Sequence, residues 1–215
     1  NTSVKLDQTT MAVKASGYRL NQVTSKDGFA LVNYPNIAAY YQTVDLNSGA
    51  DFEKDSVEFV KQNMVSDPGF KSLRPSIEVG FHSILKTYVI HTHPVYANIL
   101  CCAANGLELA NRICSGQSYN YLWIPYLKPG FNLTLKIQSE LARALRQGQY
   151  TQAGAKYPQV IFMENHGLII TADDPYECTR LHREVNDTIK AALDLKEPFP
   201  TIHLEQLEES VFISK

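Results

Sequence analysis

The sequence predicts a single α/β domain. At 215 residues with 44% hydrophobic content, the chain can bury one sizeable core and lies at the upper end of single-domain length. Short apolar runs bounded by turn residues indicate strands, and longer stretches with apolar residues three and four positions apart indicate helices. Both patterns recur along the chain, so we expect one domain over residues 1–215 in which strands and helices share a core.

The charge balance and the lack of long apolar runs limit the classes of partner. With 20 basic and 22 acidic residues the net charge is −2, so nothing indicates nucleic acid or an anionic membrane as a ligand. No apolar run approaches the ~20 residues of a membrane span, and no signal-peptide pattern is present. The four cysteines form no CxxC motif, which suits reduced thiols. We expect a soluble, cytoplasmic protein whose partners are small molecules or copies of itself.

The first third of the chain predicts mainly strands. Strands over 1–5 and 11–14 flank the polar turn Asp7-Gln8-Thr9 and should form a hairpin. The following Ala15-Ser16-Gly17 can let backbone N–H groups approach an anion, although an ordinary turn explains the same residues. The next expected elements are a strand over 28–33, a helix over 35–41 and a helix from Asp55 to about residue 65 with Val57 on its apolar face.

A short helix should come next, over residues 74–85. Pro75 and Ser76 can open this helix, which would place Glu78 in its first turn and His82 one turn further on. A first-turn carboxylate is most often a solvated partner of the helix dipole. Glu78 is nevertheless a candidate site residue, because its helix is followed directly by the strand described next. For His82, packing or support of a neighbouring ligand is the expected role.

The stretch over residues 87–96 begins as a strand that runs through two histidines. Tyr88-Val89-Ile90 is an apolar run that continues into His91 and His93, and Pro94 ends the strand. Side chains at i and i+2 of a strand lie on one face, so two imidazoles can converge on one point. Such a pair is typical of a metal site. Two histidines that merely share a face are the alternative.

The second half of the chain predicts long helices around a buried hairpin. Glu164-Asn165-His166-Gly167 should form a tight turn that exposes His166 at a strand end. Tyr126, just beyond an aromatic strand, can present its hydroxyl to a site, although aromatic residues most often pack in a core. The polar segment from Pro198 is expected on the surface. The expected elements are helices over 95–104 and 107–113, a strand over 119–126, a helix over 132–146 capped by Asn132, strands over 159–163 and 168–171, and a helix over 175–195.

Together, His91, His93 and His166 suit a catalytic metal site. Three imidazoles leave coordination positions open, which marks a catalytic rather than a structural metal. Nitrogen ligands favour zinc over magnesium or calcium. Cupins also combine a His-x-His pair with a distant histidine, but they place a glutamate soon after the pair and lack long helices. Here Val95-Tyr96-Ala97-Asn98 follows, so the cupin interpretation fails.

Motifs in a fixed order along the chain resemble the class II aldolase/adducin family of metal-dependent sugar-phosphate aldolases and epimerases. The matching motifs are NTSV at 1–4, ASG at 15–17, PSIE at 75–78, HTHP at 91–94, IPY at 124–126 and ENHGL at 164–168. Each motif alone is weak, whereas their order over nearly the whole chain is specific. The motifs VKASG and RPSIE are most similar to the aldolase part of bifunctional rhamnulose-1-phosphate aldolase/alcohol dehydrogenases.

The resemblance implies a role for each candidate residue. It implies that Zn²⁺ or another divalent transition metal is bound by His91, His93 and His166, and that Glu78 is the catalytic acid/base. It also implies that phosphate is contacted by Asn1, Ser16, Gly17 and Ser76. Tyr126 is implied to be a catalytic residue that reaches a neighbouring subunit's site. The implied fold is a three-layer α/β/α domain with a mainly antiparallel sheet. The implied assembly is a cyclic homotetramer with sites between subunits.

The reaction implied is retro-aldol cleavage of a ketose 1-phosphate, such as rhamnulose or fuculose 1-phosphate, to dihydroxyacetone phosphate and an aldehyde. A metal on neutral imidazoles can polarise a carbonyl, while a carboxylate moves the proton. The same groups could serve a 4-epimerase, a decarboxylase or a dehydratase. A non-catalytic, adducin-like interaction module is the alternative from another class, but it predicts eroded ligands, and here all are intact.

Two departures from the family pattern affect these expectations. The phosphate motif of the fuculose-phosphate type reads Ser-Ser-Glu, and here Ile77 replaces the second serine, so we expect one hydrogen bond fewer to the phosphate. The family also carries a helix and a glycine before the position of Asn1. We therefore expect that an N-terminal segment precedes the sequence given.

Overall fold

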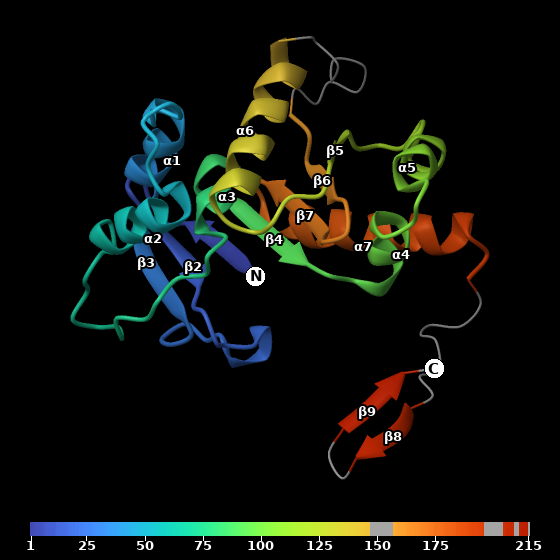
Figure 1. Cartoon of the computed structure of the whole chain (residues 1–215), viewed down its shortest axis with the longest axis horizontal. Coiled ribbons are helices and arrows are strands. Elements are labelled where there is room, and N and C mark those ends of the chain that lie inside the picture. The colour runs from blue at the N-terminus through green and yellow to red at the C-terminus, as the bar shows by residue number, and fades with distance from the viewer. Residues whose placement is uncertain (147–156, 196–203, 209–210, 215) are drawn as a thin grey trace.

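A seven-stranded sheet in the order β3-β2-β1-β4-β7-β6-β5 forms the centre of the fold (Figure 1). The computed structural model describes residues 1–146, 157–195, 204–208 and 211–214. The strands are β1 (Thr2–Lys5), β2 (Thr10–Lys14), β3 (Phe29–Asn33), β4 (Tyr88–Thr92), β5 (Tyr121–Ile124), β6 (Val160–Met163) and β7 (Gly167–Ala172). The helices are α1 (Tyr34–Thr43), α2 (Phe52–Gln62), α3 (Val79–Ile84), α4 (Val95–Cys101), α5 (Gly106–Cys114), α6 (Phe131–Arg146) and α7 (Pro175–Ala192), with a 3₁₀ turn at Leu20–Gln22. No described helix is both long and apolar enough to cross a membrane.

The sheet is mainly antiparallel, as expected, but it is mixed because one pair of strands is parallel. Five strand pairings are antiparallel, but β5 pairs with β6 in parallel, with Tyr121 opposite Val160. Parallel neighbours need a crossover connection, and here that connection contains the 16-residue helix α6. The connection brings the chain back to the end of the sheet at which β5 began, so β6 can run in the same direction as β5.

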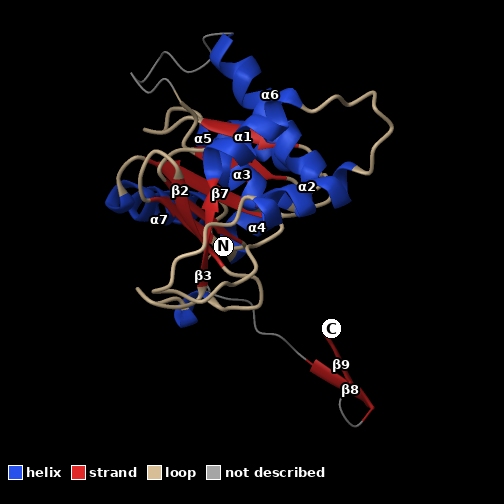
Figure 2. Cartoon of the chain, turned by 90° about the vertical axis from the view of Figure 1, so that its left-hand side faces the viewer, coloured by secondary structure: helices blue, strands red, loops and turns tan. Residues whose placement is uncertain are grey.

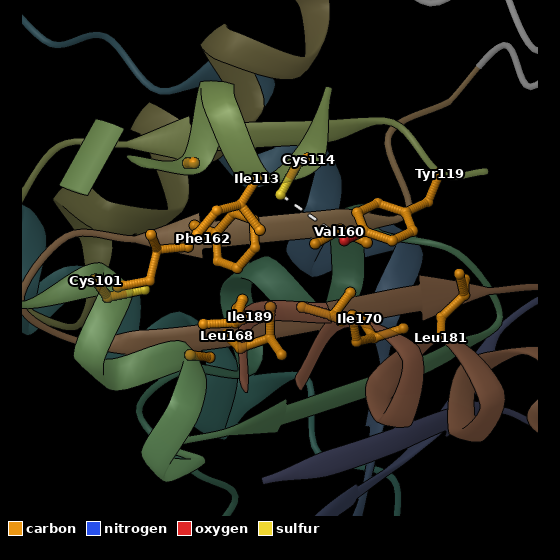
Figure 3. Close-up of a cluster of buried hydrophobic side chains, with 14 of the residues drawn as sticks. Cys101, Ile113, Cys114, Tyr119, Val160, Phe162, Leu168, Ile170, Leu181 and Ile189 are labelled. Atoms are coloured by element: carbon orange, nitrogen blue, oxygen red, sulfur yellow. Dashed lines mark hydrogen bonds between the residues drawn. The ribbon is translucent and has the colours of Figure 1, made fainter. Parts of the chain in front are cut away.

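Helices α4, α5 and α7 cover one face of the sheet. Side chains of β6 alternate between the faces, so Val160 and Phe162 join the cluster beneath these helices, whereas Ile161 and Met163 point the other way. Figure 3 shows this cluster, in which Cys101, Cys114 and Leu181 come from the three helices. Burial on both faces explains why β6 and β7 are continuous apolar runs rather than alternating ones.

The other helices cover the opposite face, as the three-layer expectation requires (Figure 2). Helices α3 and α6 pack on Val89, Ile161 and Ile169, and α1 and α2 pack on β2 and β3. His91 shares its face of β4 with Val89. Its ring meets Phe81 of α3 edge-on, with ring centroids 5.6 Å apart. The histidine pair therefore lies on the α3 side of the sheet.

The structure moves the start of the short helix that was expected over 74–85. Helix α3 begins at Val79, so Glu78 precedes the helix instead of lying in its first turn. Pro75 forms an isolated antiparallel bridge with Ala15, and the N–H of Val79 donates to the carbonyl of Ser76 at 3.2 Å in the turn that leads into α3. The chain before α3 is thus tied to the end of β2, and Glu78 lies at the junction.

The expected start of α2 was wrong, and the C-terminal tail contains a hairpin that was not expected. Helix α2 begins at Phe52, not Asp55, and it buries Ser56 and Val60, so Val57 lies off the buried face and is 51% exposed. The polar tail from Pro198 was expected on the surface; Glu205, Gln206 and Glu208 are exposed, whereas residues 198–203 lie outside the described residues. Leu204–Glu208 (β8) and Val211–Ser214 (β9) pair as an antiparallel hairpin with its own two-stranded sheet.

The N-terminus of α6 is capped from another helix. The helix starts at Phe131, so Asn132 is already inside it and is not the predicted cap. The Glu53 carboxylate on α2 accepts hydrogen bonds from the backbone N–H of Phe131 at 3.0 Å and of Asn132 at 3.4 Å. Two free donors of the first turn are satisfied, and a negative charge lies at the positive end of the helix dipole.

We expect Glu53→Ala to lower the free energy of unfolding by about 1–2 kcal/mol, because it removes this cap. Glu58→Ala is the matched control on the same helix, since Glu58 is exposed and pairs with the exposed Lys61 at 3.6 Å; its effect should stay within about 0.5 kcal/mol. Urea unfolding followed by circular dichroism measures both. Equal effects of the two substitutions would show that Glu53 does not stabilise α6.

Candidate metal centre

Two neighbouring strands bring the three predicted histidines together. His91 lies near the end of β4 and His93 just beyond it, while His166 lies in the turn that leads into β7. Because β4 pairs with β7, with His91 opposite Ile169 and Thr92 opposite Leu168, the end of β4 and the start of β7 meet. One nitrogen from each ring lies within 4.8 Å of the others. The sequence prediction that these residues converge is confirmed.

The backbone fixes the orientation of the His91 ring. Its Nδ1 lies 3.0 Å from the carbonyl oxygen of Leu168, and a carbonyl can only accept, so Nδ1 carries the proton. In the neutral ring, Nε2 then bears the lone pair, and it lies 3.2 Å from Nε2 of His93. A carbonyl that binds the second nitrogen of a metal-ligating histidine is a common way to orient the ligand.

The donor set fits a divalent transition metal. Burial is the largest cause that lowers the pKa of His93, which favours the neutral imidazole that binds metals. His91 is buried, whereas the side of the cluster formed by His93 is open to solvent. Three neutral nitrogens with an open side suit a metal that keeps coordination positions for a substrate.

The Glu78 carboxylate contacts two of the three histidines. Its Oε1 lies 3.3 Å from Nε2 of His91 and 3.2 Å from Nε2 of His166. Asn1 donates from Nδ2 to the other carboxylate oxygen at 3.5 Å. Burial alone would raise the pKa of Glu78, but its contacts with His166 and His91 lower the pKa more strongly, to well below the usual range of a glutamate. The carboxyl is therefore ionised at neutral pH, the form that accepts a proton.

The turn that carries His166 is held by α4. The N–H of Asn165 donates to the carbonyl of Cys101 at 3.0 Å, and Asn165 adopts a positive φ of 50°. Gly167 follows, and a Cβ at this position would lie 2.6 Å from Cδ2 of the His93 ring and 2.7 Å from the carbonyl oxygen of Thr92. Glycine is needed here because the backbone passes against a metal-site ring.

The residues with expected phosphate contacts form two groups. Ser16 and Ser76 line one cavity of about 390 Å³, because the bridge between Ala15 and Pro75 joins their segments. Gly17 adjoins Ser16 with a positive φ of 85° and open space beside its Cα. Asn1 lies next to Glu78 instead, as described above.

Arg74 also lines this cavity and was not identified from the sequence. Its Nη2 donates to Oγ of Ser16 at 3.0 Å. Its position two residues before Ser76, in RPSIE, was the available signal. Its guanidinium adds a positive charge to a cavity for which the sequence motifs predicted only neutral groups.

Tyr126 and His82 lie outside the cluster of histidines. The Tyr126 side chain is 53% exposed, and its backbone N–H donates to Glu164 at 3.0 Å, which ties its loop to the turn of His166. His82 is fully buried, with Nδ1 2.7 Å from Oγ of Ser3. Burial, followed by the charge of His91, lowers the pKa of His82 to about 3, so the ring is neutral. Packing, as the sequence suggested, describes His82.

We expect Gly167→Ala to weaken metal binding about tenfold or more, because the added methyl group would displace the His93 ring. Competition with a chromophoric chelator measures the affinity. Gly69→Ala is the control, since a Cβ there meets only the flexible side chain of Asp67, at 3.2 Å. Wild-type affinity in Gly167→Ala would mean that the ring of His93 is not constrained by this glycine.

Comparisons with known proteins identify one sequence relative of this chain and several solved structures with a similar fold. The chain is 29% identical to the uncharacterized oxidoreductase YuxG of Bacillus subtilis (strain 168) over 127 residues, which are 59% of this chain and 16% of that relative. The chain therefore spans well under two thirds of this relative's length.

Solved structures with the same fold include a class II aldolase domain. The N-terminal class II aldolase domain of a conserved protein from Thermoplasma acidophilum has a TM-score of 0.68 and 20% identity, and the match covers 89% of this chain and 82% of that one. L-fuculose 1-phosphate aldolase has a TM-score of 0.54 and 15% identity, with 94% and 80% covered. At these identities the likeness concerns the fold alone. A family model, the class II aldolase and adducin N-terminal domain, matches residues 1–193, so the chain belongs to the class II aldolase and adducin family.

Proposed function

We propose that this chain is a zinc-dependent sugar-phosphate aldolase that cleaves a ketose 1-phosphate into dihydroxyacetone phosphate and an aldehyde. The observation that carries the proposal is the convergence of three imidazole nitrogens within 4.8 Å of one another, with the Glu78 carboxylate against two of them. The neutral imidazoles would bind the metal, and the ionised carboxylate beside them would transfer the proton. Cleavage of a carbon–carbon bond next to a carbonyl needs a metal and a proton-transfer group.

His91, His93 and His166 would hold the metal. Bound there, a divalent ion supplies Lewis-acid polarisation of the substrate's carbonyl. Zinc suits these ligands best because they offer nitrogen only, whereas magnesium and calcium prefer oxygen. Other divalent transition metals bind the same ligands and would support the same role.

Glu78 would move the proton. Its carboxylate lies beside the histidine cluster and can take a proton from the substrate's hydroxyl or give one to its carbon, while Asn1 holds the second oxygen in place. Cleavage removes the proton of the hydroxyl that becomes the aldehyde's carbonyl, and Tyr126, whose side chain is exposed, would contact that oxygen in a neighbouring subunit. This role requires an oligomer, which we propose to be a homotetramer with sites between subunits.

The substrate we favour is a phosphorylated deoxyketose of the rhamnulose or fuculose type. Ser16, Gly17 and Ser76 would bind its phosphate, with Asn1 nearer the reacting end. The fold is similar to that of L-fuculose 1-phosphate aldolase, and the relative from Bacillus subtilis is named as an oxidoreductase. Both similarities are compatible with an aldolase domain of the kind joined to a dehydrogenase.

We expect about one zinc ion per chain in protein purified without added metal. His91→Ala, His93→Ala and His166→Ala should each abolish this content. His182→Ala is the matched control, because His182 binds Oγ1 of Thr92 at 2.7 Å and lies outside the cluster. Inductively coupled plasma mass spectrometry measures the metal. A chain that takes up no zinc when zinc is supplied would refute the assignment.

We expect Glu78→Gln to retain zinc but to lose roughly 10²-fold or more in turnover, because the amide cannot exchange the proton. Glu58→Gln on the surface of α2 is the control. The assay is release of dihydroxyacetone phosphate from a panel of ketose 1-phosphates. Epimerised, decarboxylated or dehydrated products without this release would assign the site to those reactions. No conversion of any substrate by zinc-loaded wild type would favour an adducin-like module.

A further inference from the structure

We infer that Arg74 supplies the positive charge of the phosphate subsite and makes the substrate's phosphate a determinant of specificity. The inference rests on the proposed function and extends it. The residues that the sequence motifs assign to phosphate offer only neutral hydroxyl, amide and backbone groups. The structure places a guanidinium among them.

The backbone of Arg74 is fixed against the Ser16 turn. Its carbonyl accepts a hydrogen bond from the N–H of Ser16 at 2.8 Å, next to the bridge between Ala15 and Pro75. Its side chain donates to Oγ of Ser16 at 3.0 Å. Backbone and side chain thus hold the guanidinium at the turn where Gly17 leaves open space for a ligand to approach the backbone.

The charge of Arg74 is not neutralised by a neighbour. In the part of the chain that the structure describes, the ion pairs within 4.0 Å do not include Arg74. Lys61 lines the same cavity but lies 3.6 Å from the Glu58 carboxylate. A guanidinium that forms no ion pair with a described carboxylate and lies beside the Ser16 hydroxyl favours an anion over a neutral sugar group.

The shape of the guanidinium suits a phosphate. It carries five N–H donors in a planar fork, so it can donate to Ser16 and still bind two oxygens of a phosphate. Ser76 lines the same cavity, and its Oγ accepts a hydrogen bond from the backbone N–H of Glu78 at 3.3 Å. The subsite therefore adjoins the segment that carries the proposed acid/base, and a bound phosphate would locate the rest of the substrate beside it.

Arg74 can also compensate for the hydroxyl group that is missing at position 77. Ile77 lines the cavity and is 56% exposed, so this position adds an apolar wall where the fuculose-phosphate motif has a hydroxyl. A charge-assisted hydrogen bond is about twice as strong as a neutral one. The guanidinium can therefore compensate for the hydroxyl that Ile77 does not provide, and phosphate binding need not be weak.

The test measures the binding of inorganic phosphate to zinc-loaded protein by isothermal titration calorimetry. We expect Arg74→Gln to raise the Kd about tenfold or more, because it removes hydrogen bonds to a charged group. Arg74→Lys should lose less affinity, since the charge remains but the fork does not. Arg183→Gln, an exposed arginine of α7 on the opposite face of the sheet, is the control and should match wild type. Added salt should weaken wild-type binding more than binding to Arg74→Gln.

The outcomes separate this inference from the proposed function. Wild-type Kd in Arg74→Gln, or no phosphate binding by wild type, overturns the role of Arg74 even if the protein cleaves ketose phosphates. A loss of affinity in Arg74→Gln that Arg74→Lys partly restores supports the role, even if wild type shows no aldolase activity. Equal losses in Arg74→Gln and Arg74→Lys, accompanied by a lower melting temperature, would assign Arg74 to holding the turn and overturn the inference.

Discussion

The antiparallel pairing of β4 with β7 is the constraint on which the site depends. It places His91 opposite Ile169 and brings the turn of His166 to the end of β4. The same ladder positions the carbonyl of Leu168 to accept from Nδ1 of His91. A shift of the register by one residue would turn every side chain of β4 to the other face and separate the imidazoles. The sheet therefore specifies both the location and the tautomer of the metal-site histidines.

Packing around this pair of strands keeps the register unique. β6 and β7 are buried on both faces, by α4, α5 and α7 on one side and by α3 and α6 on the other. Slippage by one residue would exchange side chains between two close-packed clusters, and the resulting cavities and overlaps cost free energy. The polar site therefore depends on the buried core: apolar packing fixes the strands, and the metal-site histidines lie at the ends of these strands.

A second set of contacts joins the proton-transfer group to the anion cavity. The bridge between Ala15 and Pro75 docks the chain before α3 onto the end of β2. Arg74 and Ser76 then lie on the cavity side, and Glu78, a few residues later, reaches His91 and His166. One short segment thus links charge recognition to the histidine cluster. This proximity is why a substrate held by its phosphate could present its reacting carbons to Glu78.

The sequence alone determined the elements whose signals are local. Strand alternation placed His91 and His93 on one face, and Pro94 and Gly167 marked the ends at which histidines emerge. Features made by residues far apart in the chain depended on the tertiary structure. Glu53 replaces the expected Asn132 cap because another helix lies against α6. Glu78 precedes α3 because Pro75 pairs with Ala15, and the same contact brings Arg74 to Ser16. Periodicity and turn residues encode local geometry, whereas these contacts exist only after distant segments pack together.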